Sequence, residues 1–296
     1  MSNHFSYRTC DRCGKRHDPT ATLCPQCKRE FHFEDENLFV HDVHVGWLKN
    51  LIFFLVGFVG FQILGSILST IFQTAFTGEW LSAHPGATKE ELQAALIEYV
   101  RTGSYILLVN GIAYGLLIIA MFVILGKGIG ELLRGWKGWK PYVAGLIGFA
   151  VVIGLNMGWG LIMNIIHPNT DPNNNQNAIN TVIAAYPVLS ILLFGIVGPV
   201  CEEFTYRIGL FSLSKRISRV FAYIVTPLVF GFIHFDWNVL LGGWSEALAI
   251  ELLNIPSYVL AGVALSFIYD KFGIGAAMIA HIGNNLIGII PSALPH

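Results

Sequence analysis

Charged residues are scarce in this chain. Asp, Glu, Lys and Arg make up 12% of the 296 residues, and 54% are hydrophobic. A typical soluble domain carries about 25% charged residues, so the composition excludes an ordinary soluble protein. The mean hydropathy of +0.58 points the same way. We therefore predict a polytopic membrane protein whose apolar runs form transmembrane helices.

The chain also lacks an excess of charge of either sign. Its formal net charge is −1, and no basic stripe or aromatic spacing suggests a nucleic-acid surface. We expect the lipid bilayer and a peptide or protein as partners, and no nucleic acid. A basic segment followed by a short apolar run, the mark of a signal peptide, is missing because the first 45 residues are polar. The sequence carries no signal for the oligomeric state.

Cysteine is rare and unevenly placed. Four of the five cysteines, Cys10, Cys13, Cys24 and Cys27, form two C-x-x-C pairs separated by ten residues. The fifth, Cys201, lies alone in the apolar region. This distribution argues against a disulfide framework. Two such pairs can each form a tight knuckle that presents two thiolates, which together make a tetrahedral zinc site.

We therefore predict a zinc ribbon over residues 1–32, with a structural Zn that supplies the folding energy of a segment too short for its own core. The segment resembles the zinc ribbons that precede many bacterial membrane domains. Two local disulfides, or a site in which His17 replaces a cysteine, are the alternatives. Thiolate ligands favour a reducing compartment, which predicts a cytoplasmic N-terminus. Residues 33–46 are predicted to be a polar linker, in which His41 and His44 need not form a second metal site.

Residues 47–296 are predicted to form an all-α transmembrane domain, a bundle of about seven to eight helices. The seven predicted spans are Trp47–Phe76, Tyr105–Leu125, Tyr142–Ile166, Pro187–Leu213, Phe221–Leu240, Leu252–Tyr269 and Ile274–Ile290. The first is long enough to tilt or to continue beyond the bilayer. Pro256 is expected to kink or shorten the sixth. A re-entrant segment around Trp237–Leu253 would add an eighth helix.

Loop charges predict the orientation. The basic residues gather in the N-terminal tail and in the second, fourth and sixth loops, the loop members being Lys127, Arg134, Lys137, Lys140, Lys215, Arg216, Arg219 and Lys271. Loops three and five contain no Lys or Arg, and loop one is mixed. The positive-inside rule then places the N-terminus in the cytoplasm and, with seven spans, the C-terminus outside. In loop one, the capping box at Thr88 predicts a short amphipathic helix.

Ionisable side chains interrupt the fourth span. Glu202, Glu203 and Arg207 follow an uncharged run that begins at Tyr186. Each such charge costs about 3 kcal/mol at the centre of a membrane helix, so the three must be paired or enclosed within the bundle. Glu203 and Arg207 are four residues apart and share one helix face, which predicts an ion pair. Glu202 points about 100° away and lacks that partner, so its raised proton affinity suits a general base.

Two more polar groups lie on later apolar spans. His234 follows Phe230 by one helical turn, and Phe230 is expected to pack beneath the imidazole. His281 and Asn285 are four residues apart on the last span and present two polar groups to one face. Hydrogen-bond donors held in a site of low dielectric constant are suited to stabilising an oxyanion. Each group alone is as well explained by interhelical packing, but the set of a base, two histidines, an amide and an arginine exceeds what packing needs.

At these residues the sequence resembles the CAAX protease and bacteriocin-processing family (Abi, or CPBP) of intramembrane glutamic proteases. The family pattern is E-E-x-x-x-R, then F-x-x-x-H, then H-x-x-x-N or H-x-x-x-D, on successive membrane helices. The resemblance covers about residues 186–292, the predicted protease core. Two positions depart from the pattern: Ile208 stands where a glycine is common, with Gly209 one place later, and Cys201 replaces an apolar or small residue.

The resemblance implies a metal-independent endopeptidase, in the membrane of a bacterial cell, that hydrolyses a peptide bond of a membrane-associated substrate. Glu202, assisted by His234, would activate water, and His281 and Asn285 would stabilise the oxyanion. Glu203, Arg207 and Phe230 would be supporting residues. No cofactor would take part in catalysis.

Three other hypotheses remain open on the residues alone. Glu202, His234 and His281 are a plausible ligand set for a zinc-dependent intramembrane metalloprotease. Cys201 is a weaker candidate as a nucleophile, since no histidine lies on its helix. A protein without catalytic activity, such as a peptide-binding or immunity scaffold or a proton-coupled transporter, would also use intramembrane Glu and His.

Overall fold

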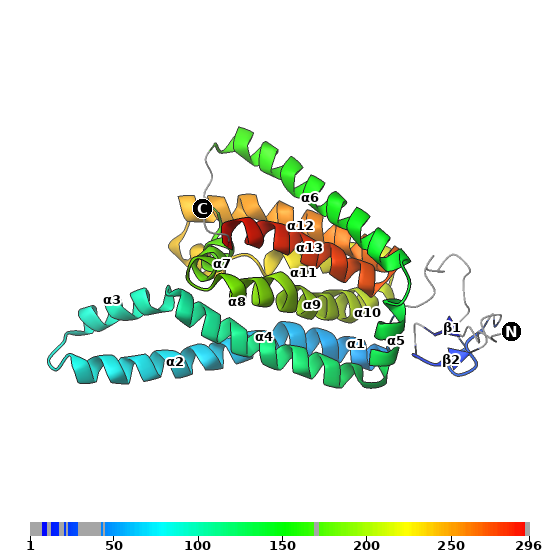
Figure 1. The fold of residues 1–296 in the computed structure, drawn as a ribbon, viewed down its shortest axis with the longest axis horizontal. Coiled ribbons are helices and arrows are strands. Elements are labelled where there is room, and N and C mark those ends of the chain that lie inside the picture. The colour runs from blue at the N-terminus through cyan, green and yellow to red at the C-terminus, as the bar shows by residue number, and fades with distance from the viewer. Residues whose placement is uncertain are drawn as a thin grey trace.

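The computed structural model describes residues 8–10, 13–17, 21, 23–28, 43, 45–168 and 172–293. Within these residues a small two-stranded module precedes a bundle of helices (Figure 1). The predicted all-α membrane domain and its N-terminal cysteine module are therefore both present. The predicted linker over residues 33–46, with His41 and His44, lies almost wholly outside the described residues.

The N-terminal module is built from two short strands and two cysteine knuckles. Strands β1 (Arg8–Thr9) and β2 (Arg16–His17) pair antiparallel. The N–H of Gly14 donates to the Cys10 carbonyl at 2.8 Å, and the N–H of Lys28 donates to the Cys24 carbonyl at 2.9 Å. Each C-x-x-C pair therefore lies in a tight turn, as the spacing predicts.

The bundle contains α-helices, several of which continue into short stretches of π-helix or 3-10 helix. Its elements are α1 (Trp47–Phe54), η2 (Leu55–Gly60), α2 (Phe61–Ala83), α3 (Lys89–Val100), α4 (Gly103–Leu125), η3 (Gly126–Gly128), α5 (Ile129–Gly135), α6 (Lys140–Ile166), α7 (Asn174–Ala185), α8 (Pro187–Leu192), η4 (Leu193–Val197), α9 (Gly198–Glu202), η5 (Glu203–Phe211), α10 (Ser212–Lys215), α11 (Arg219–Phe232), η6 (Trp237–Gly242), α12 (Glu246–Phe272) and α13 (Ile274–Ala293). The π-helical stretches are η2, η4 and η5, and η3 is a 3-10 helix. A further 3-10 helix, η6, lies between α11 and α12.

Six helices of the described residues are long and apolar enough to cross a membrane. They are Trp47–Ala83, Gly103–Gly135, Lys140–Ile166, Pro187–Lys215, Glu246–Phe272 and Ile274–Ser292. These six correspond to six of the seven predicted spans. The first continues seven residues past its predicted end at Phe76. The chain is therefore an integral membrane protein.

The fifth predicted span is wrong in its second half. Helix α11 ends at Phe232 rather than at Leu240 and has 14 residues, too few to count among the six long helices. The backbone turns at His234, and Asp236 then caps η6 by accepting a hydrogen bond from the N–H of Asn238 at 3.0 Å. A capping aspartate in an extended conformation starts a new turn, so the helix cannot continue through it.

Two other expectations about helix ends are corrected. Pro256 does not shorten its span, because α12 runs unbroken for 27 residues from Glu246. The segment around Trp237–Leu253 does not form a separate helix but divides between η6 and the first turns of α12. Helix α7, by contrast, occupies a loop that hydropathy leaves unassigned. Asn173 caps it by accepting from the N–H of Gln176 at 3.0 Å.

The segment α8–α10 lies at the centre of the bundle. In Figure 1 it runs between α12 and α13 on one side and α1, α2 and α4 on the other, with α6 outermost beside α12 and α13. Half of the residues in the most apolar part of this segment are buried, a larger share than in any other of the six long helices. Close packing relies on glycines, since a Cβ at Gly209 would lie 2.8 Å from the backbone nitrogen of Phe54. The centre of this segment is where the two glutamates lie.

Basic residues gather at the end of the bundle that carries the cysteine module. Strands β1 and β2, helices α5 and α10, and the end of α12 all lie at that end (Figure 1). There Lys215 and Arg219 both bind Asp270, at 2.8 and 2.6 Å, and join α10 and α11 to α12. The predicted capping box at Thr88 is also present at the start of α3.

Candidate active site

The double glutamate lies where a regular helix becomes a wider one. Glu202 is the last residue of α9, and Glu203 is the first of the π-helical turn η5. Thr205 donates its hydroxyl hydrogen bond back to the Cys201 carbonyl at 2.8 Å. Such π-helical turns are uncommon and often mark functional sites. All nine residues of η5 are buried.

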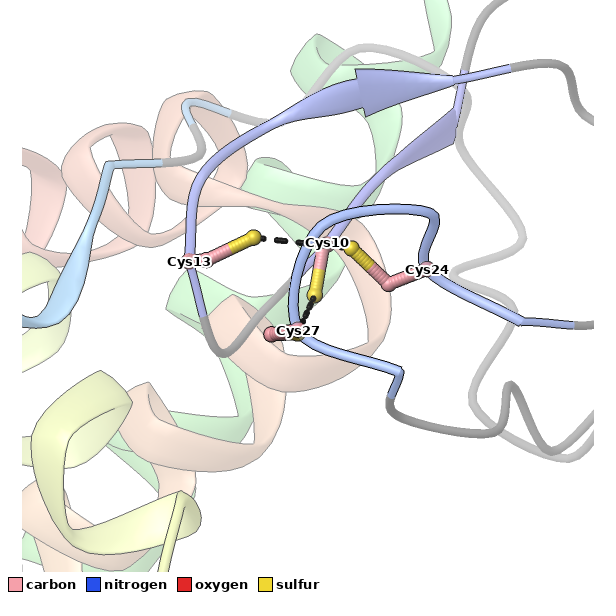
Figure 2. A group of neighbouring side chains, drawn as sticks. All are labelled: Cys10, Cys13, Cys24 and Cys27. Atoms are coloured by element: carbon pink, nitrogen blue, oxygen red, sulfur yellow. Dashed lines mark hydrogen bonds between the residues drawn. The ribbon is translucent and has the colours of Figure 1, made fainter.

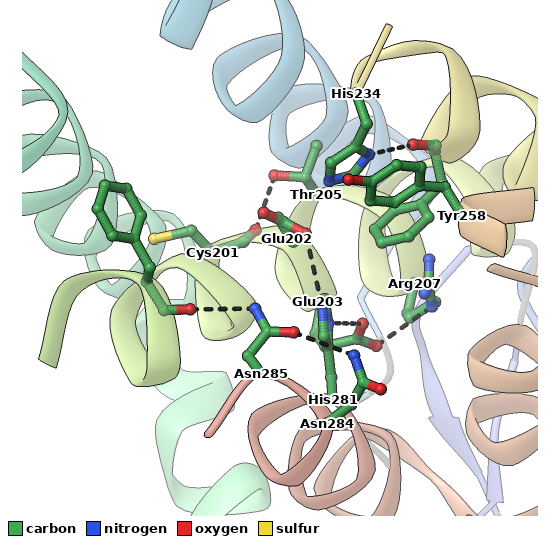
Figure 3. Close-up of polar contacts among 12 residues, drawn as sticks. Cys201, Glu202, Glu203, Thr205, Arg207, His234, Tyr258, His281, Asn284 and Asn285 are labelled. Carbon is green, nitrogen blue, oxygen red and sulfur yellow. Dashed lines mark hydrogen bonds and ion pairs between the residues drawn. The ribbon is translucent and has the colours of Figure 1, made fainter. Parts of the chain in front are cut away.

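Glu203 is fully buried between two cationic or protonatable partners (Figure 3). Its Oε2 lies 3.2 Å from Nε of Arg207, and its Oε1 lies 2.9 Å from Nδ1 of His281. The predicted ion pair of Glu203 and Arg207 is therefore present. The contact with His281 joins the fourth span to the last one.

Arg207 is the largest fully buried side chain among the described residues. Its Cζ lies 5.0 Å from the centre of the Phe230 ring, a distance at which the ring face attracts a cation. Its Nη1 and Nη2 atoms make no hydrogen bond to the described residues. Most of its stabilisation therefore comes from Glu203 and Phe230, so Phe230 packs against the arginine as well as beneath His234.

Glu202 faces the opposite way and reaches a cavity. Its side chain is 16% exposed, whereas that of Glu203 is fully buried. Tyr114 donates a long hydrogen bond to Oε1 at 3.5 Å, and Nε2 of His281 lies 3.6 Å from Oε2. His281 therefore lies between the two glutamates, with one ring nitrogen toward each.

His234 lies in the turn that follows α11. Its Nδ1 is 2.7 Å from the Phe230 carbonyl, which can only accept, so Nδ1 carries the proton. In the neutral ring Nε2 is then the proton acceptor. The imidazole stacks on the Tyr258 ring with 4.2 Å between centroids, and Asn173 donates to the His234 carbonyl at 3.2 Å. The ring is thereby fixed in tautomer and in orientation (Figure 3).

Asn285 is held by a chain of amides. Its Nδ2 donates to the Phe194 carbonyl at 3.0 Å, and its Oδ1 accepts from Asn284 at 3.3 Å. Asn284 accepts in turn from Asn156 of α6 at 3.0 Å. One N–H of the Asn285 amide thus remains available for a ligand.

A cavity of about 840 Å³ collects these groups. Glu202, His234, His281 and Asn285, the four predicted catalytic residues, all line it, and Phe230 lines it as well. Glu203 and Arg207 are not among the lining residues and lie behind Glu202 and His281. Side chains from three separate helical segments therefore meet at one open space.

Cys201 also borders the cavity, but its thiol is poorly placed for nucleophilic attack. Figure 3 shows it pointing away from His234 and His281. Within the described part of the chain, no hydrogen bond joins its sulfur to a histidine. A base that could generate the thiolate is thus missing from its surroundings.

The four N-terminal cysteines come together as predicted (Figure 2). Their sulfur atoms all lie within 4.8 Å of one another, with Cys10 and Cys27 at 3.4 Å and Cys13 and Cys24 at 3.5 Å. A tetrahedral zinc with bonds of about 2.3 Å needs sulfur atoms about 3.8 Å apart. None of these four described cysteines is in a disulfide. The group is therefore able to bind a metal ion.

The electrostatics of Cys24 favour metal binding. Burial alone would raise the pKa of its thiol, but hydrogen bonds from the backbone N–H groups of Cys27 and Gln26 outweigh burial and lower the pKa to about 6. The thiolate, which is the form that binds a metal, is therefore accessible near neutral pH. Arg16 also forms an ion pair with Glu131 of α5, which attaches the module to the bundle.

Among the described residues, the four cysteines are the one group of three or more His, Cys, Asp or Glu whose ligand atoms lie this close together. Glu202, His234 and His281 do not form such a group. Nε2 of His281 does lie 3.6 Å from Oε2 of Glu202, but the ligand atoms of all three residues do not lie within 4.8 Å of one another.

Residues 184–287 match the model of a family described as "Type II CAAX prenyl endopeptidase Rce1-like". The match confirms the family resemblance. It includes all seven residues that the motifs single out.

Three curated proteins are similar to this chain. A candidate membrane peptidase of Bacillus subtilis, YdiL, is 28% identical over 42% of this chain and 45% of its own length. A UPF0177 protein of Lactococcus lactis, YvdC, is 23% identical over 52% of this chain and 54% of its own length. An uncharacterized protein of Mycoplasma capricolum is 27% identical over 63% of this chain and 55% of its own length. The chain thus spans about half the length of these relatives. No solved structure matches it.

Several site residues carry no motif signal. Tyr114, Tyr258 and Asn156 each contact a predicted catalytic residue or its neighbour, but they lie on other helices. Asn284 differs from them because it lies within the His281–Asn285 motif, directly before Asn285. Tertiary packing, rather than spacing along a helix, brings the others to the site.

Substitution of Arg207 tests the buried cluster. Arg207→Met leaves the Glu203 carboxylate buried without its cation, and we expect the free energy of unfolding to fall by about 3–5 kcal/mol. Arg207→Met combined with Glu203→Gln removes both charges and should be less destabilising than Arg207→Met alone. Denaturation in detergent micelles measures both effects, with the exposed Lys89→Met as a control. A double variant whose loss equals the sum of the two single losses would contradict the coupling.

Proposed function

We propose that the chain is an intramembrane endopeptidase in which Glu202, assisted by His234, activates a water molecule. The observation that carries the proposal is the convergence of Glu202, His234, His281 and Asn285 on one cavity inside a membrane bundle. At the level of the family, the similarity to CAAX endopeptidases and to a candidate membrane peptidase supports a membrane protease.

The proposed reaction begins with the abstraction of a proton from water by Glu202 or by Nε2 of His234. The hydroxide adds to the carbonyl carbon of the scissile peptide bond and forms a tetrahedral oxyanion. Because Nδ1–H of His281 is held by Glu203, Nε2 can donate only when the ring is an imidazolium. In that form Nε2–H of His281, together with the free N–H of Asn285, donates hydrogen bonds to the oxyanion, which is the largest stabilising effect in most acyl transfers. The C–N bond then breaks, and the abstracted proton passes to the nitrogen of the leaving amine.

The buried pair behind the site supports this chemistry. The Glu203 carboxylate accepts from Nδ1 of His281 and so leaves Nε2 directed at the cavity. Arg207 balances the charge of Glu203, which prevents two unpaired carboxylates from lying side by side. Glu202 is then the one carboxylate that faces the substrate.

A zinc-dependent membrane protease is the second candidate, and one observation favours it. Both His234 and His281 hold Nδ1 against an acceptor and direct Nε2 toward the cavity, an arrangement typical of histidines that bind metals. Glu202 would be the third ligand. Glu202 and His281 already lie 3.6 Å apart, but all three ligand atoms would have to come within 4.8 Å of one another to match the cysteine group.

A Glu202→Gln variant distinguishes the proposed enzyme from a binding scaffold. Purified protein is offered a peptide library that includes secreted-peptide leaders and a prenylated C-terminal peptide, and products are identified by mass spectrometry. We expect cleavage by the wild type to fall by about 10²–10⁴-fold in Glu202→Gln, because general base catalysis is lost. Cys201→Ala, the matched neighbour, should retain activity.

Normal cleavage by Glu202→Gln would contradict the proposed role of Glu202 as the general base. Loss of activity in Cys201→Ala would favour the thiol instead. A chelator added to a variant without ribbon cysteines tests the zinc candidate: inhibition there would favour it over the metal-independent reaction. No cleavage by the wild type of any library peptide would favour a scaffold.

We also propose that Cys10, Cys13, Cys24 and Cys27 hold a structural zinc ion. The sulfur distances and the lowered pKa of Cys24 support this ligand set. Elemental analysis of the purified chain should find about one zinc per molecule, and Cys10→Ser with Cys24→Ser should remove it without touching the membrane site. Full zinc content in that double variant would show that the metal binds elsewhere.

The orientation remains part of the proposal. We place the cysteine module in the cytoplasm of a bacterial cell, with a membrane-associated peptide or protein as substrate. The four metal-ligand cysteines, none of which is in a disulfide, and the basic residues at the same end of the bundle support this placement.

A further inference from the structure

The cavity is lined by an unusual number of carboxamides. Nine of its lining side chains are Asn or Gln, and five of them lie on α6, α7 and α12. We call these five the amide arm: Asn156, Asn164, Asn175, Gln176 and Asn254. Among the described residues that line the cavity, none is Lys or Arg, and Glu202 is the one acidic residue.

The amide arm has polar groups to spare. Nδ2 of Asn254 donates to the Ile250 carbonyl of its own helix at 2.8 Å, which leaves Oδ1 for another partner. Nδ2 of Asn156 is used by Asn284, and Oδ1 again remains. Asn164 makes no hydrogen bond to the described residues. Asn156 and Asn254 are half-buried within their membrane spans, where an unpaired amide is costly, so their free oxygens require water or a polar ligand, whereas Asn164 is exposed near the end of α6.

The chemistry of the arm defines its ligand. A carboxamide offers one acceptor and two donors, which are the groups that a peptide main chain pairs with. Without Lys or Arg among its described lining residues, the cavity offers no permanently charged cation with which to select a free carboxylate or a phosphate. The arm therefore suits a neutral, hydrogen-bonding chain in which donors and acceptors alternate.

The arm is continuous with the catalytic residues. Asn175 donates to the Tyr258 hydroxyl at 3.5 Å, and the Tyr258 ring stacks on His234. At the other side, Asn156 is joined through Asn284 to Asn285. A chain bound along the arm thus leads to both sides of the reacting centre.

We propose that the amide arm binds the main chain of an extended, unlipidated substrate peptide next to the scissile bond. The inference rests on the proposed peptidase function and adds the subsite that holds the substrate. Recognition through the main chain makes the arm tolerant of substrate sequence. An isoprenoid chain in the same place would leave the amides facing hydrocarbon without partners, so lipidation contributes nothing to binding here.

Peptide affinity tests the arm separately from the chemistry. The full chain carrying Glu202→Gln is titrated with a fluorescent, acetylated and amidated peptide of Ser, Gly, Ala and Asn, and with the same peptide carrying an S-farnesyl cysteine. Asn164→Leu and Asn254→Leu keep the number and branching of the side-chain heavy atoms but remove the hydrogen-bonding groups. Each should raise the Kd of the unmodified peptide about three- to tenfold.

Asn110→Leu is the matched control. Asn110 lines the same cavity from α4 and, like Asn254, bonds its own helix through Nδ2, so its position outside the arm is the one difference that the comparison tests. We expect its Kd to change by less than about twofold. If a leucine variant shows no cooperative thermal unfolding and is therefore not folded, the serine variants Asn164→Ser and Asn254→Ser are used instead. They should also raise the Kd of the unmodified peptide.

Tighter binding of the farnesylated peptide by about tenfold or more, or an unchanged Kd for the unmodified peptide in both arm variants, would overturn the proposal. Equal binding of the two peptides, weakened by both arm variants, supports it. Mass spectra of the same samples show whether Glu202→Gln cleaves the peptide. If the catalytic mechanism is wrong, Glu202→Gln still forms cleavage product. If the proposed role of the arm is wrong, the arm variants leave the Kd of the unmodified peptide unchanged.

Discussion

The structure depends on the neutralisation of one carboxylate inside an apolar bundle. Glu203 has no exposure to solvent, and its two oxygens face Arg207 and His281. A buried charge without a partner is strongly destabilising, so the helices that carry these residues must pack together. The Phe230 ring beside the guanidinium extends the constraint to α11. Three helical segments are thus held in one arrangement by one charge cluster.

This constraint gives the two adjacent glutamates different surroundings. The face of η5 that carries Glu203 is closed, whereas Glu202 meets a cavity whose other walls carry His234, His281 and Asn285. The same histidine that pairs with Glu203 through Nδ1 reaches Glu202 with Nε2. The stability of the bundle and the orientation of the proposed catalytic groups therefore rest on shared contacts. A substitution in the buried cluster should disturb both.

Much of the fold follows from hydropathy, and the site follows from helical spacing. The motifs place Glu202, Glu203 and Arg207, and then His234, His281 and Asn285, on helix faces that do meet. Hydropathy mispredicts helices whose ends or composition are determined by polar side chains. Helix α11 ends early because Asp236 caps the next turn. Helix α7 escapes notice because carboxamides such as Asn175 and Gln176 keep its hydropathy below that of a membrane span, although Val182 and Ile183 give it a buried apolar side. Tyr114 and Tyr258 are found only through tertiary packing, which spacing along the chain does not encode.

The proposed attack by water is tested most directly by a single turnover in H₂¹⁸O with enzyme in excess over peptide. Direct attack by an activated water predicts one ¹⁸O atom in the new carboxylate of the product and none in the enzyme. If Glu202 instead attacked the carbonyl as a nucleophile, the amine would leave and a mixed anhydride would form. Water that opened this anhydride at the Glu202 carbonyl would leave ¹⁸O in the enzyme peptide that contains residue 202 and ¹⁶O from Glu202 in the new carboxylate of the product. That second result would contradict the account of Glu202 as a general base.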